Sequence, residues 1–174
     1  MRIKEECLDI TKEMIKSLRE QSGAGIMDCR GALAGCGGDM EKALEVLKEK
    51  GLLKAQKKSE RTTGQGLIEA YIHTAGRIGA MVEVNCETDF VARTDEFKGL
   101  AHCLAMQVAA MDPQYISEKN IPEGKEVIAA EACLMKQPYI KDPTKTIKDI
   151  IIEVIAKTGE NIKVSRFIRY ELGG

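Results

Sequence analysis

Residues 67–84 read LIEAYIHTAGRIGAMVEV and place two segments of strand-forming side chains on either side of a short turn. The first segment, Leu67 to Thr74, is rich in β-branched and aromatic residues, and Ala75-Gly76-Arg77 supplies the turn. In the second segment, every other residue is apolar: Ile78, Ala80, Val82 and Val84. A period of two places these side chains on one face of a strand, so the stretch predicts a β-hairpin with one buried face.

Further along the chain, the pattern predicts one more strand and the helices that cover the sheet. Helical spacing of apolar residues indicates one helix around Phe97 to Val108 and another around Ile147 to Ile155, and Val127 to Met135 is a candidate for a further helix. The last strand is expected to place five residues on one face: Ile162, Val164, Ile168, Tyr170 and Leu172. About three antiparallel strands covered by helices form an α+β core, which we assign to residues 67–174.

The first 55 residues have helical rather than alternating periodicity and predict a domain of three short helices. Ser22 to Gly25 ends the first helix, the second extends from about Ile26 to Cys36, and Asp39 is placed to cap the third, which is expected to end at Gly51. Helices of this length are not stable alone. They are therefore expected to pack around shared apolar residues: Ile15, Leu18, Leu33, Leu44 and Leu47.

Residues 56–66 are predicted to be a polar linker between these two domains. Lys57 to Gly64 offers almost nothing to bury, although the beginning of the segment is compatible with a continuing helix. Limited proteolysis is expected to cut first within this linker. First cuts inside residues 26–50 would argue against the boundary.

Composition and charge exclude several classes of function. The chain of 174 residues is 44% hydrophobic and 30% charged, with a formal net charge of −1, so no general attraction to nucleic acid is expected. It has no tryptophan and only 4% aromatic residues, which argues against binding through base stacking. No run of 18 apolar residues predicts a membrane span, and the charged start does not resemble a secretory signal. We therefore expect a cytoplasmic protein with no direct nucleic-acid or membrane partner.

The cysteines do not form a recognisable metal or redox motif. The six are Cys7, Cys29, Cys36, Cys86, Cys103 and Cys133. No two have Cys-x-x-Cys spacing, and the chain has only two histidines, His73 and His102, so no metal ligand set is expected. His102 and Cys103 are a poor base–nucleophile pair because adjacent helical positions point in different directions. A thiol enzyme remains an alternative, and it predicts loss of activity on alkylation.

The sequence contains no other recognisable catalytic motif. The sequence has no Gly-x-x-x-x-Gly-Lys-Ser/Thr phosphate loop and no Gly-x-Gly-x-x-Gly after a strand. Gly23-Ala24-Gly25 follows a helix, which is the wrong context for dinucleotide binding. No pair of carboxylates is singled out as acid and base. We expect neither catalysis nor a cofactor.

Residues 85–93, NCETDFVAR, follow a predicted strand and precede a predicted helix. Thr88 or Asp89 can cap a short helical turn, after which Phe90 and Val91 are apolar residues among charged ones. Two interpretations of Phe90 stay open at this stage. Its ring folds back into the core, or it is an exposed aromatic wedge for a partner protein.

Several motifs together resemble the elongation factor Ts family. The residues that carry the resemblance are Leu18-Arg19-Glu20, Gly23-Ala24-Gly25, Met27-Asp28-Cys29, Lys54-Ala55 with Lys58, Asn85 to Arg93, and Gly159-Glu160-Asn161-Ile162. They occur in the order expected of that family and extend from about Ile10 to Leu172. The resemblance implies an N-terminal domain like the ubiquitin-associated fold, followed by an α+β core of the dimerisation type in a short form with one subdomain.

The resemblance also implies a function and its residues. The partner would be elongation factor Tu, GDP-bound or nucleotide-free, and the activity would be guanine-nucleotide exchange. The residues that would disturb the partner's Mg²⁺ and phosphate site are Thr88, Asp89, Phe90 and Val91. The N-terminal domain and linker would contact the partner through Arg19, Ile26, Met27 and Lys58, and the core through Thr158 and Gly159.

The chain departs from the family pattern in three places, and a second class of function stays open. Ile26 stands where the family usually has Met, Thr158 replaces a branched apolar residue, and the segment from Ile121 to Gln137 is short. A homodimer is left open. The alternative function is an interaction module without exchange activity, in which residues 1–55 hold a helix or a ubiquitin-like surface and carry the affinity.

Overall fold

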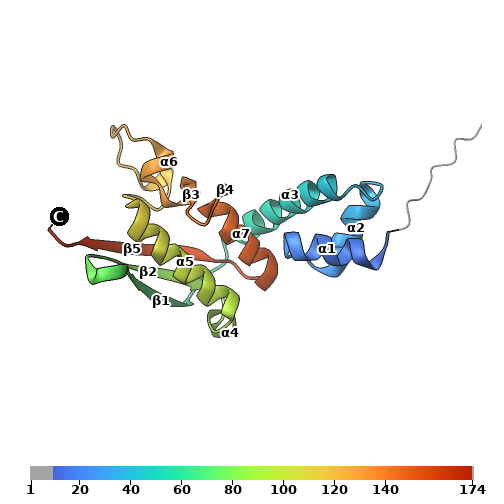
Figure 1. Ribbon diagram of the computed structural model, residues 1–174, viewed down its shortest axis with the longest axis horizontal. Coiled ribbons are helices and arrows are strands. Elements are labelled where there is room, and N and C mark those ends of the chain that lie inside the picture. Colours follow the sequence, from blue (N-terminus) through green and yellow to red (C-terminus); the bar gives the residue numbers. More distant parts are fainter. Residues whose placement is uncertain (1–9, 174) are drawn as a thin grey trace, which may run out of the picture. The chain divides into compact units, whose positions relative to one another are not determined.

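The computed structural model describes residues 10–173, so Cys7 and the charged start lie outside the described residues. The chain divides into two compact units, Met1–Lys57 and Lys58–Gly174. The α+β fold class predicted from the sequence is confirmed, with helices in the first unit and a three-stranded antiparallel sheet with helices in the second (Figure 1).

The first unit consists of three helices, α1 (Lys12–Ser22), α2 (Ile26–Gly35) and α3 (Met40–Lys58). Helix α1 ends at Gly23, whose φ of 66° lies in the left-handed region that glycine adopts without strain. The Asp39 carboxylate accepts hydrogen bonds from the amides of Glu41 and Lys42, each at 3.1 Å, so it caps α3 as predicted. The buried core of the unit consists of Leu18, Cys29, Ala32, Leu33, Ala43 and Leu47. Ile15 and Leu44, also expected in the core, are partly buried against it.

The prediction that the third helix ends at Gly51 is wrong, because α3 continues through this glycine to Lys58. A glycine inside a helix costs only about 1 kcal/mol relative to alanine. The residues after it favour helix, and Lys54 forms an ion pair with Asp28 of α2 at 3.0 Å. Good helix formers and a tertiary contact thus outweigh the glycine.

The second unit is built on the predicted hairpin and one distant strand. Strands β1 (Gln65–Ile72) and β2 (Ile78–Cys86) pair antiparallel, and β2 also pairs antiparallel with β5 (Lys163–Glu171). The strand order is therefore β1-β2-β5 (Figure 1). The turn between β1 and β2 contains the short 3₁₀ helix η1 (Thr74–Gly76), and Ala75 within it has a φ of 70°.

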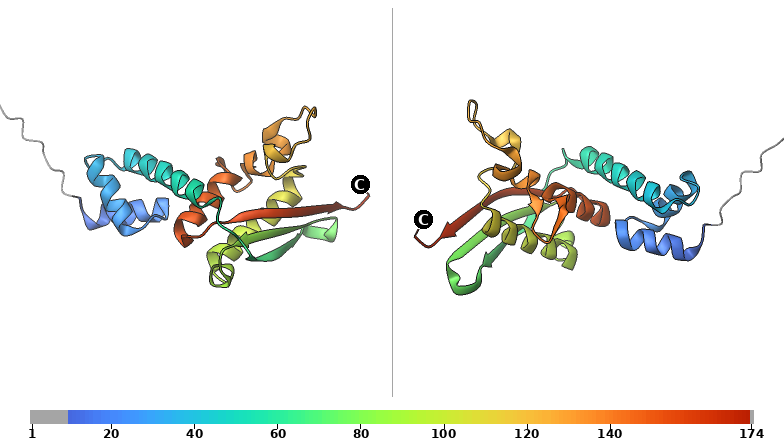
Figure 2. Two further views of the ribbon diagram at one scale, coloured as in Figure 1. Left: turned by 180° about the vertical axis from the view of Figure 1, so that it is seen from behind. Right: turned by 45° about the horizontal axis from the view of Figure 1, so that its top comes forward.

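Helix α5 (Asp95–Met111) covers one face of this sheet (Figure 1). Its buried apolar residues include those predicted from the spacing: Phe97, Leu100, Ala101, Leu104, Ala105 and Val108. Helix α7 (Ile147–Thr158) packs against α5. When the molecule is turned by 180°, the three strands lie in front of α5, so the view is onto the other face of the sheet (Figure 2). That face carries several exposed apolar side chains: Ile68, Ile72, Met81, Ile168 and Tyr170.

The prediction that one face of the last strand carries all five apolar residues is wrong. The pairing with β2 shifts at Glu83/Val84, where Arg166 pairs with Glu83 and Val164 pairs with Val84, leaving Ser165 as an extra residue. A one-residue bulge moves every later side chain to the opposite face. Val164 is therefore 7% exposed, whereas Tyr170 is 67% exposed.

The segment between α5 and α7 differs from the single helix expected over Val127 to Met135. It contains the short helix α6 (Ala129–Ala132), the 3₁₀ helices η2 (Glu118–Asn120) and η3 (Leu134–Lys136), and a small hairpin of β3 (Pro138–Tyr139) and β4 (Asp142–Thr146). Two buried amides hold this segment against α5: the Gln107 Nε2 atom donates to Gln137 Oε1 at 3.2 Å. Long-range polar contacts of this kind leave no periodic pattern in the sequence.

Candidate functional site

The candidate site centres on α4 (Asp89–Ala92), a helix of four residues between β2 and α5. The Thr88 hydroxyl oxygen accepts a hydrogen bond from the Val91 amide at 3.4 Å, so Thr88 rather than Asp89 is the N-cap. The Asp89 carboxylate instead pairs with Arg93 on the following turn at 2.9 Å. The cap therefore fixes the start of the helix and leaves the Asp89 side chain facing outward.

The two apolar side chains of α4 point in opposite directions. Phe90 is 81% exposed, whereas Val91 is only 9% exposed. Of the two interpretations of Phe90, the exposed ring is therefore the one that the structure contains. Val91 anchors the helix to the rest of the unit. Thr88, Asp89 and Phe90 form the accessible part of the predicted set.

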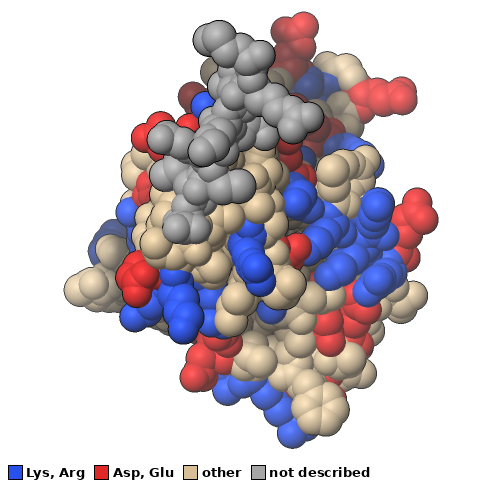
Figure 3. Space-filling view, turned by 90° about the vertical axis from the view of Figure 1, so that its right-hand side faces the viewer, with Lys and Arg blue, Asp and Glu red and all other residues tan. Residues whose placement is uncertain are grey.

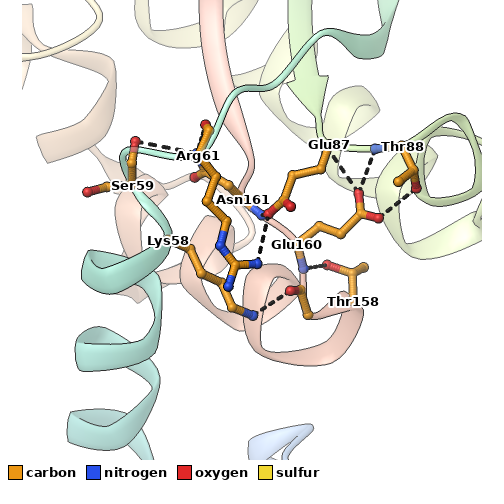
Figure 4. A network of polar contacts seen from close by, with 9 residues as sticks. Lys58, Ser59, Arg61, Glu87, Thr88, Thr158, Glu160 and Asn161 are labelled. Carbon is orange, nitrogen blue, oxygen red and sulfur yellow. Dashed lines mark hydrogen bonds and ion pairs between the residues drawn. The ribbon is translucent and has the colours of Figure 1, made fainter.

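The Glu160 carboxylate binds the start of α4 from the loop between α7 and β5 (Figure 4). Its Oε2 atom accepts hydrogen bonds from the amides of Glu87 at 3.1 Å and Thr88 at 3.0 Å. Its Oε1 atom accepts a third from the Thr88 hydroxyl at 2.6 Å. One carboxylate thus satisfies three donors of Glu87 and Thr88, shortly before Phe90 in the sequence.

Asn161 continues this network on the other side of the same loop (Figure 4). Its backbone amide donates to the Glu87 carboxylate at 2.6 Å, and its side-chain amide donates to the carbonyls of Ser59 at 3.4 Å and Arg61 at 2.9 Å. Asn161 is only 2% exposed. The residues directly after α3 are therefore held by a buried amide rather than left as a free linker.

Three of the predicted partner-binding residues lie close to this network. The Lys58 ammonium donates to the carbonyl of Gly159, the residue at which α7 ends with a φ of 78°. Thr158 donates to the Val154 carbonyl at 2.9 Å, within its own helix. The structure thus brings Lys58, Thr158 and Gly159 together, next to the carboxylate that binds Thr88.

The other predicted contacts lie in the first unit and are described within it. Arg19 is exposed on α1, and Ile26 and Met27 are 55% and 74% exposed in the first turn of α2. Two exposed apolar residues at a helix start suit a contact with another protein.

On the face drawn in Figure 3, acidic side chains lie among the basic ones with other residues between them, so that face is not uniformly basic.

The histidine and cysteine side chains of the described residues make separate polar contacts. Among residues 10–173, no three His, Cys, Asp or Glu side chains are arranged to hold a metal ion. His102 Nδ1 contacts Glu69 at 2.9 Å, while the neighbouring Cys103 thiol accepts a hydrogen bond from Tyr139 at 3.0 Å. Cys86 is fully buried, and burial raises the pKa of its thiol.

In the described part of the chain, no helix has the length and apolar character needed to cross a membrane.

Comparison with known proteins decides the family. The model of the family described as Elongation factor TS matches residues 37–130 and 124–174. The chain belongs to the elongation factor Ts family. It is 51% identical to elongation factor Ts of Thermotoga petrophila, over 95% of this chain and 98% of that relative. It is 47% identical to the one from Carboxydothermus hydrogenoformans, over 94% of this chain and 89% of that relative.

In this member of the elongation factor Ts family, sequence reasoning missed four residues of the network: Arg61, Glu87, Glu160 and Asn161. Glu160 and Asn161 stood in a motif that carried the resemblance, but no role was assigned to either. The local sequence gives one indication that these two side chains bind backbone groups, since a carboxylate and an amide directly follow the glycine that ends a helix. The amides that Glu160 binds directly follow β2, and the carbonyls that the Asn161 side chain binds directly follow α3, both far away in the sequence.

Alkylation is expected to modify this elongation factor Ts homologue slowly at Cys86 and to leave its binding surface intact. Burial and a pKa above the ordinary value keep the Cys86 thiol protonated at neutral pH, and thiolates are the reactive form. Cys133, also buried, has a pKa raised in the same way. Peptide mass spectrometry after iodoacetamide treatment measures each rate, with the partly exposed Cys103 as the faster internal comparison.

The same reasoning predicts that replacing all six cysteines by Ala or Ser lowers stability through lost packing but preserves function in the folded fraction. Circular dichroism gives that fraction. A well-folded variant without activity would show that a thiol takes part in the function.

Substitution of Asn161 by alanine is expected to accelerate cleavage between residues 59 and 64. The variant loses the amide that holds two carbonyls of this segment, and one hydrogen bond of ~1 kcal/mol corresponds to about a five-fold change in the open population. Timed limited trypsin digestion measures the rate, with Asn120→Ala as a control elsewhere in the same unit. Equal cleavage rates for both variants would show that Asn161 does not hold the segment.

Proposed function

We propose that this chain is the guanine-nucleotide exchange factor of translation elongation, acting in the cytoplasm on elongation factor Tu. The observation that carries the proposal is Phe90, an aromatic ring 81% exposed on a helix that Thr88 caps and Val91 anchors, within the motif that resembles the family. Aromatic side chains that become buried in an interface with a partner are frequent binding hot spots. Membership of the family supports a role in elongation.

In this proposal the chain acts by wedging and supplies no reactive group. Nucleotide phosphates in such a GTPase are held by backbone amides, a lysine and Mg²⁺. Phe90 inserts between side chains of the partner and displaces an element near the metal, and Asp89 and Thr88 lie beside it. The phosphate charge is then less well neutralised, so GDP dissociates faster and GTP can bind. A rigid wedge requires no acid, base or cofactor.

The remaining predicted residues supply binding energy away from the wedge. In the first unit, Arg19, Ile26 and Met27 offer one charged and two apolar exposed side chains. In the second unit, Lys58, Thr158 and Gly159 lie together through the Lys58–Gly159 hydrogen bond. In this proposal both sets of residues contribute the same binding free energy before and after GDP leaves. They therefore stabilise the complex without themselves driving release.

Thermodynamic reciprocity gives the test of this function. If the chain weakens GDP binding by a given factor, GDP must weaken binding of the chain by the same factor. Titration calorimetry with nucleotide-free and GDP-saturated elongation factor Tu measures both affinities. The proposal predicts clearly tighter binding to the nucleotide-free form. Equal affinities would leave only the alternative, an interaction module, in which residues 1–55 carry the affinity and exchange is absent.

We also propose that a second copy of the chain covers the exposed face of the sheet. Ile68, Met81 and Ile168 line a depression on this face, and Arg166 and Glu83 form an ion pair of 2.6 Å beside it. A two-fold interface brings the same surface of two copies together, and a face that carries apolar side chains and both signs of charge can pair with itself. Sedimentation velocity is expected to show a dimer that Met81→Glu dissociates. A wild-type monomer at all concentrations would contradict this.

A further inference from the structure

We propose that Glu160 is the positioning residue of the Phe90 wedge: its carboxylate fixes the orientation of α4, and Glu160 itself does not touch the partner's nucleotide site. The inference rests on the proposed function and assigns a residue to it from another part of the fold. The three hydrogen bonds from Glu87 and Thr88 to the Glu160 carboxylate carry the argument.

Helix α4 has no stability of its own. Four residues form a single turn, and a helix of this length does not persist without tertiary contacts. Val91 and Ala92, each 9% exposed, hold its underside. The Cys86 thiol also donates to the Thr88 carbonyl at 3.1 Å. The amides at the start of the turn and the Thr88 hydroxyl still need acceptors of their own if Phe90 is to project in one direction.

Glu160 supplies these acceptors. The Thr88 hydroxyl caps the helix through the Val91 amide and donates to Glu160 Oε1, so one side chain joins the cap to the carboxylate. The amides of Glu87 and Thr88 donate to Oε2. Hydrogen bonds to an ionised carboxylate are shorter and stronger than those between neutral groups. The residue two positions before Phe90 is consequently fixed at both its backbone and its side chain.

The linkage is reciprocal, which makes it rigid. Glu160 accepts from the amide of Glu87, and the carboxylate of Glu87 accepts from the amide of Asn161 at 2.6 Å. Arg61 also contacts the Glu87 carboxylate at 3.5 Å. Two antiparallel carboxylate–amide contacts join the loop before β5 to the loop after β2, far apart in sequence. Rotation of either loop breaks bonds in both directions.

Burial and hydrogen bonding separate Glu160 from Phe90. Phe90 faces outward, while Glu160 is half-buried and both its carboxylate oxygens are occupied by donors of this chain. A carboxylate already bonded to three donors has little capacity left for a partner. Its effect on exchange is therefore expected to act through Phe90, which a double-mutant cycle measures.

The first experiment compares three variants in stimulated GDP release from elongation factor Tu. Glu160→Ala removes all three hydrogen bonds, Glu160→Gln keeps an oxygen that accepts from the two amides, and Glu153→Ala removes a half-buried carboxylate of α7 that pairs with Lys145. Glu160→Ala is expected to lower the maximal rate about ten-fold, the effect of losing a charged hydrogen bond. Glu160→Gln recovers most of this rate, and Glu153→Ala retains it.

Two further readouts distinguish positioning from loss of fold or of direct contact. Amide hydrogen exchange in Glu160→Ala is expected to accelerate at Thr88 and Val91, with β2 and α5 still protected. The concentration that gives half the maximal rate stays within about two-fold, because the other binding contacts remain. A folded Glu160→Ala variant with the wild-type rate overturns the inference, as does a Glu160→Gln variant that is as slow as Glu160→Ala.

The decisive measurement places Glu160→Ala in the Phe90→Ala background. If Glu160 acts only by orienting the ring, the double variant is no slower than Phe90→Ala alone. A further ten-fold loss in the double variant would show that Glu160 acts independently and would overturn the inference. Failure of the proposed function looks different, since wild-type protein itself would then leave GDP release unchanged.

Discussion

Replacing Phe90 by alanine is expected to reduce the stimulated rate of GDP release from elongation factor Tu about thirty-fold while leaving the folding of this chain nearly unchanged. The ring is 81% exposed, so its removal opens no cavity. A hot-spot aromatic contributes ~2 kcal/mol or more to a complex, which corresponds to roughly thirty-fold. Plain binding is expected to fall less, because the contacts of Arg19, Met27 and Lys58 remain.

Thermal unfolding and GDP release measured side by side test this expectation. Asp89→Ala serves as a second probe and is expected to act in the same direction. It leaves the cap intact, because Thr88 caps α4 and Asp89 pairs only with Arg93 in the described structure. A large fall in melting temperature with normal exchange by the folded protein would assign Phe90 a structural role instead.

Replacing Phe97 by alanine is expected to have the opposite pattern, a loss of about 3–5 kcal/mol in the free energy of unfolding with little change in exchange per folded molecule. Phe97 is fully buried in the first turns of α5, seven positions after Phe90. Its removal leaves a cavity against the sheet. Phe90→Ala and Phe97→Ala thus form a matched pair, in which the same substitution is made at one exposed and one buried position.

Urea unfolding followed by circular dichroism measures the loss for Phe97→Ala, and the folded fraction at assay temperature normalises its exchange rate. Phe97→Leu is the control, because it retains most of the buried volume and is expected to lose much less stability. A stable Phe97→Ala variant with poor exchange would reverse the roles assigned to the two rings.

Much of the fold follows from periodicity in the sequence. Alternation at Ile78, Ala80, Val82 and Val84 gave the hairpin, and helical spacing from Phe97 to Val108 gave α5. Both patterns arise because each element buries one face, which is a local property of its own residues. The cap at Asp39 and the glycine at the end of α1 were equally local, and both are present in the structure.

The errors arose where tertiary contacts override local preference. Ser165 carries no sign that β2 pairs around it, yet this bulge decides that Ile168 and Tyr170 face outward. Gly51 suggested a helix end, but the flanking residues and the Lys54–Asp28 ion pair extend α3 beyond it.

The candidate site was predictable in its location but not in its arrangement. The charged surroundings of Phe90 left both an exposed and a buried ring open, and only the packing of Val91 beneath α4 decides between them. Val91, which the resemblance places at the partner's magnesium site, is 9% exposed in this chain. Glu160 lies in a motif that carries the family resemblance, but the sequence does not indicate what its carboxylate binds. Its three donors belong to a loop more than seventy residues earlier in the sequence.

The central claim, that this chain promotes release of GDP, is tested most directly by turnover. Elongation factor Tu loaded with fluorescent GDP is mixed with excess unlabelled nucleotide and about one-tenth as much of this chain, and the loss of fluorescence is followed in time. We expect all of the bound GDP to be released at an accelerated rate, since each molecule of the chain acts repeatedly, and we expect Phe90→Ala to abolish most of the acceleration. Release at the intrinsic rate, or acceleration confined to the fraction of partner equal to the amount of chain added, would contradict it.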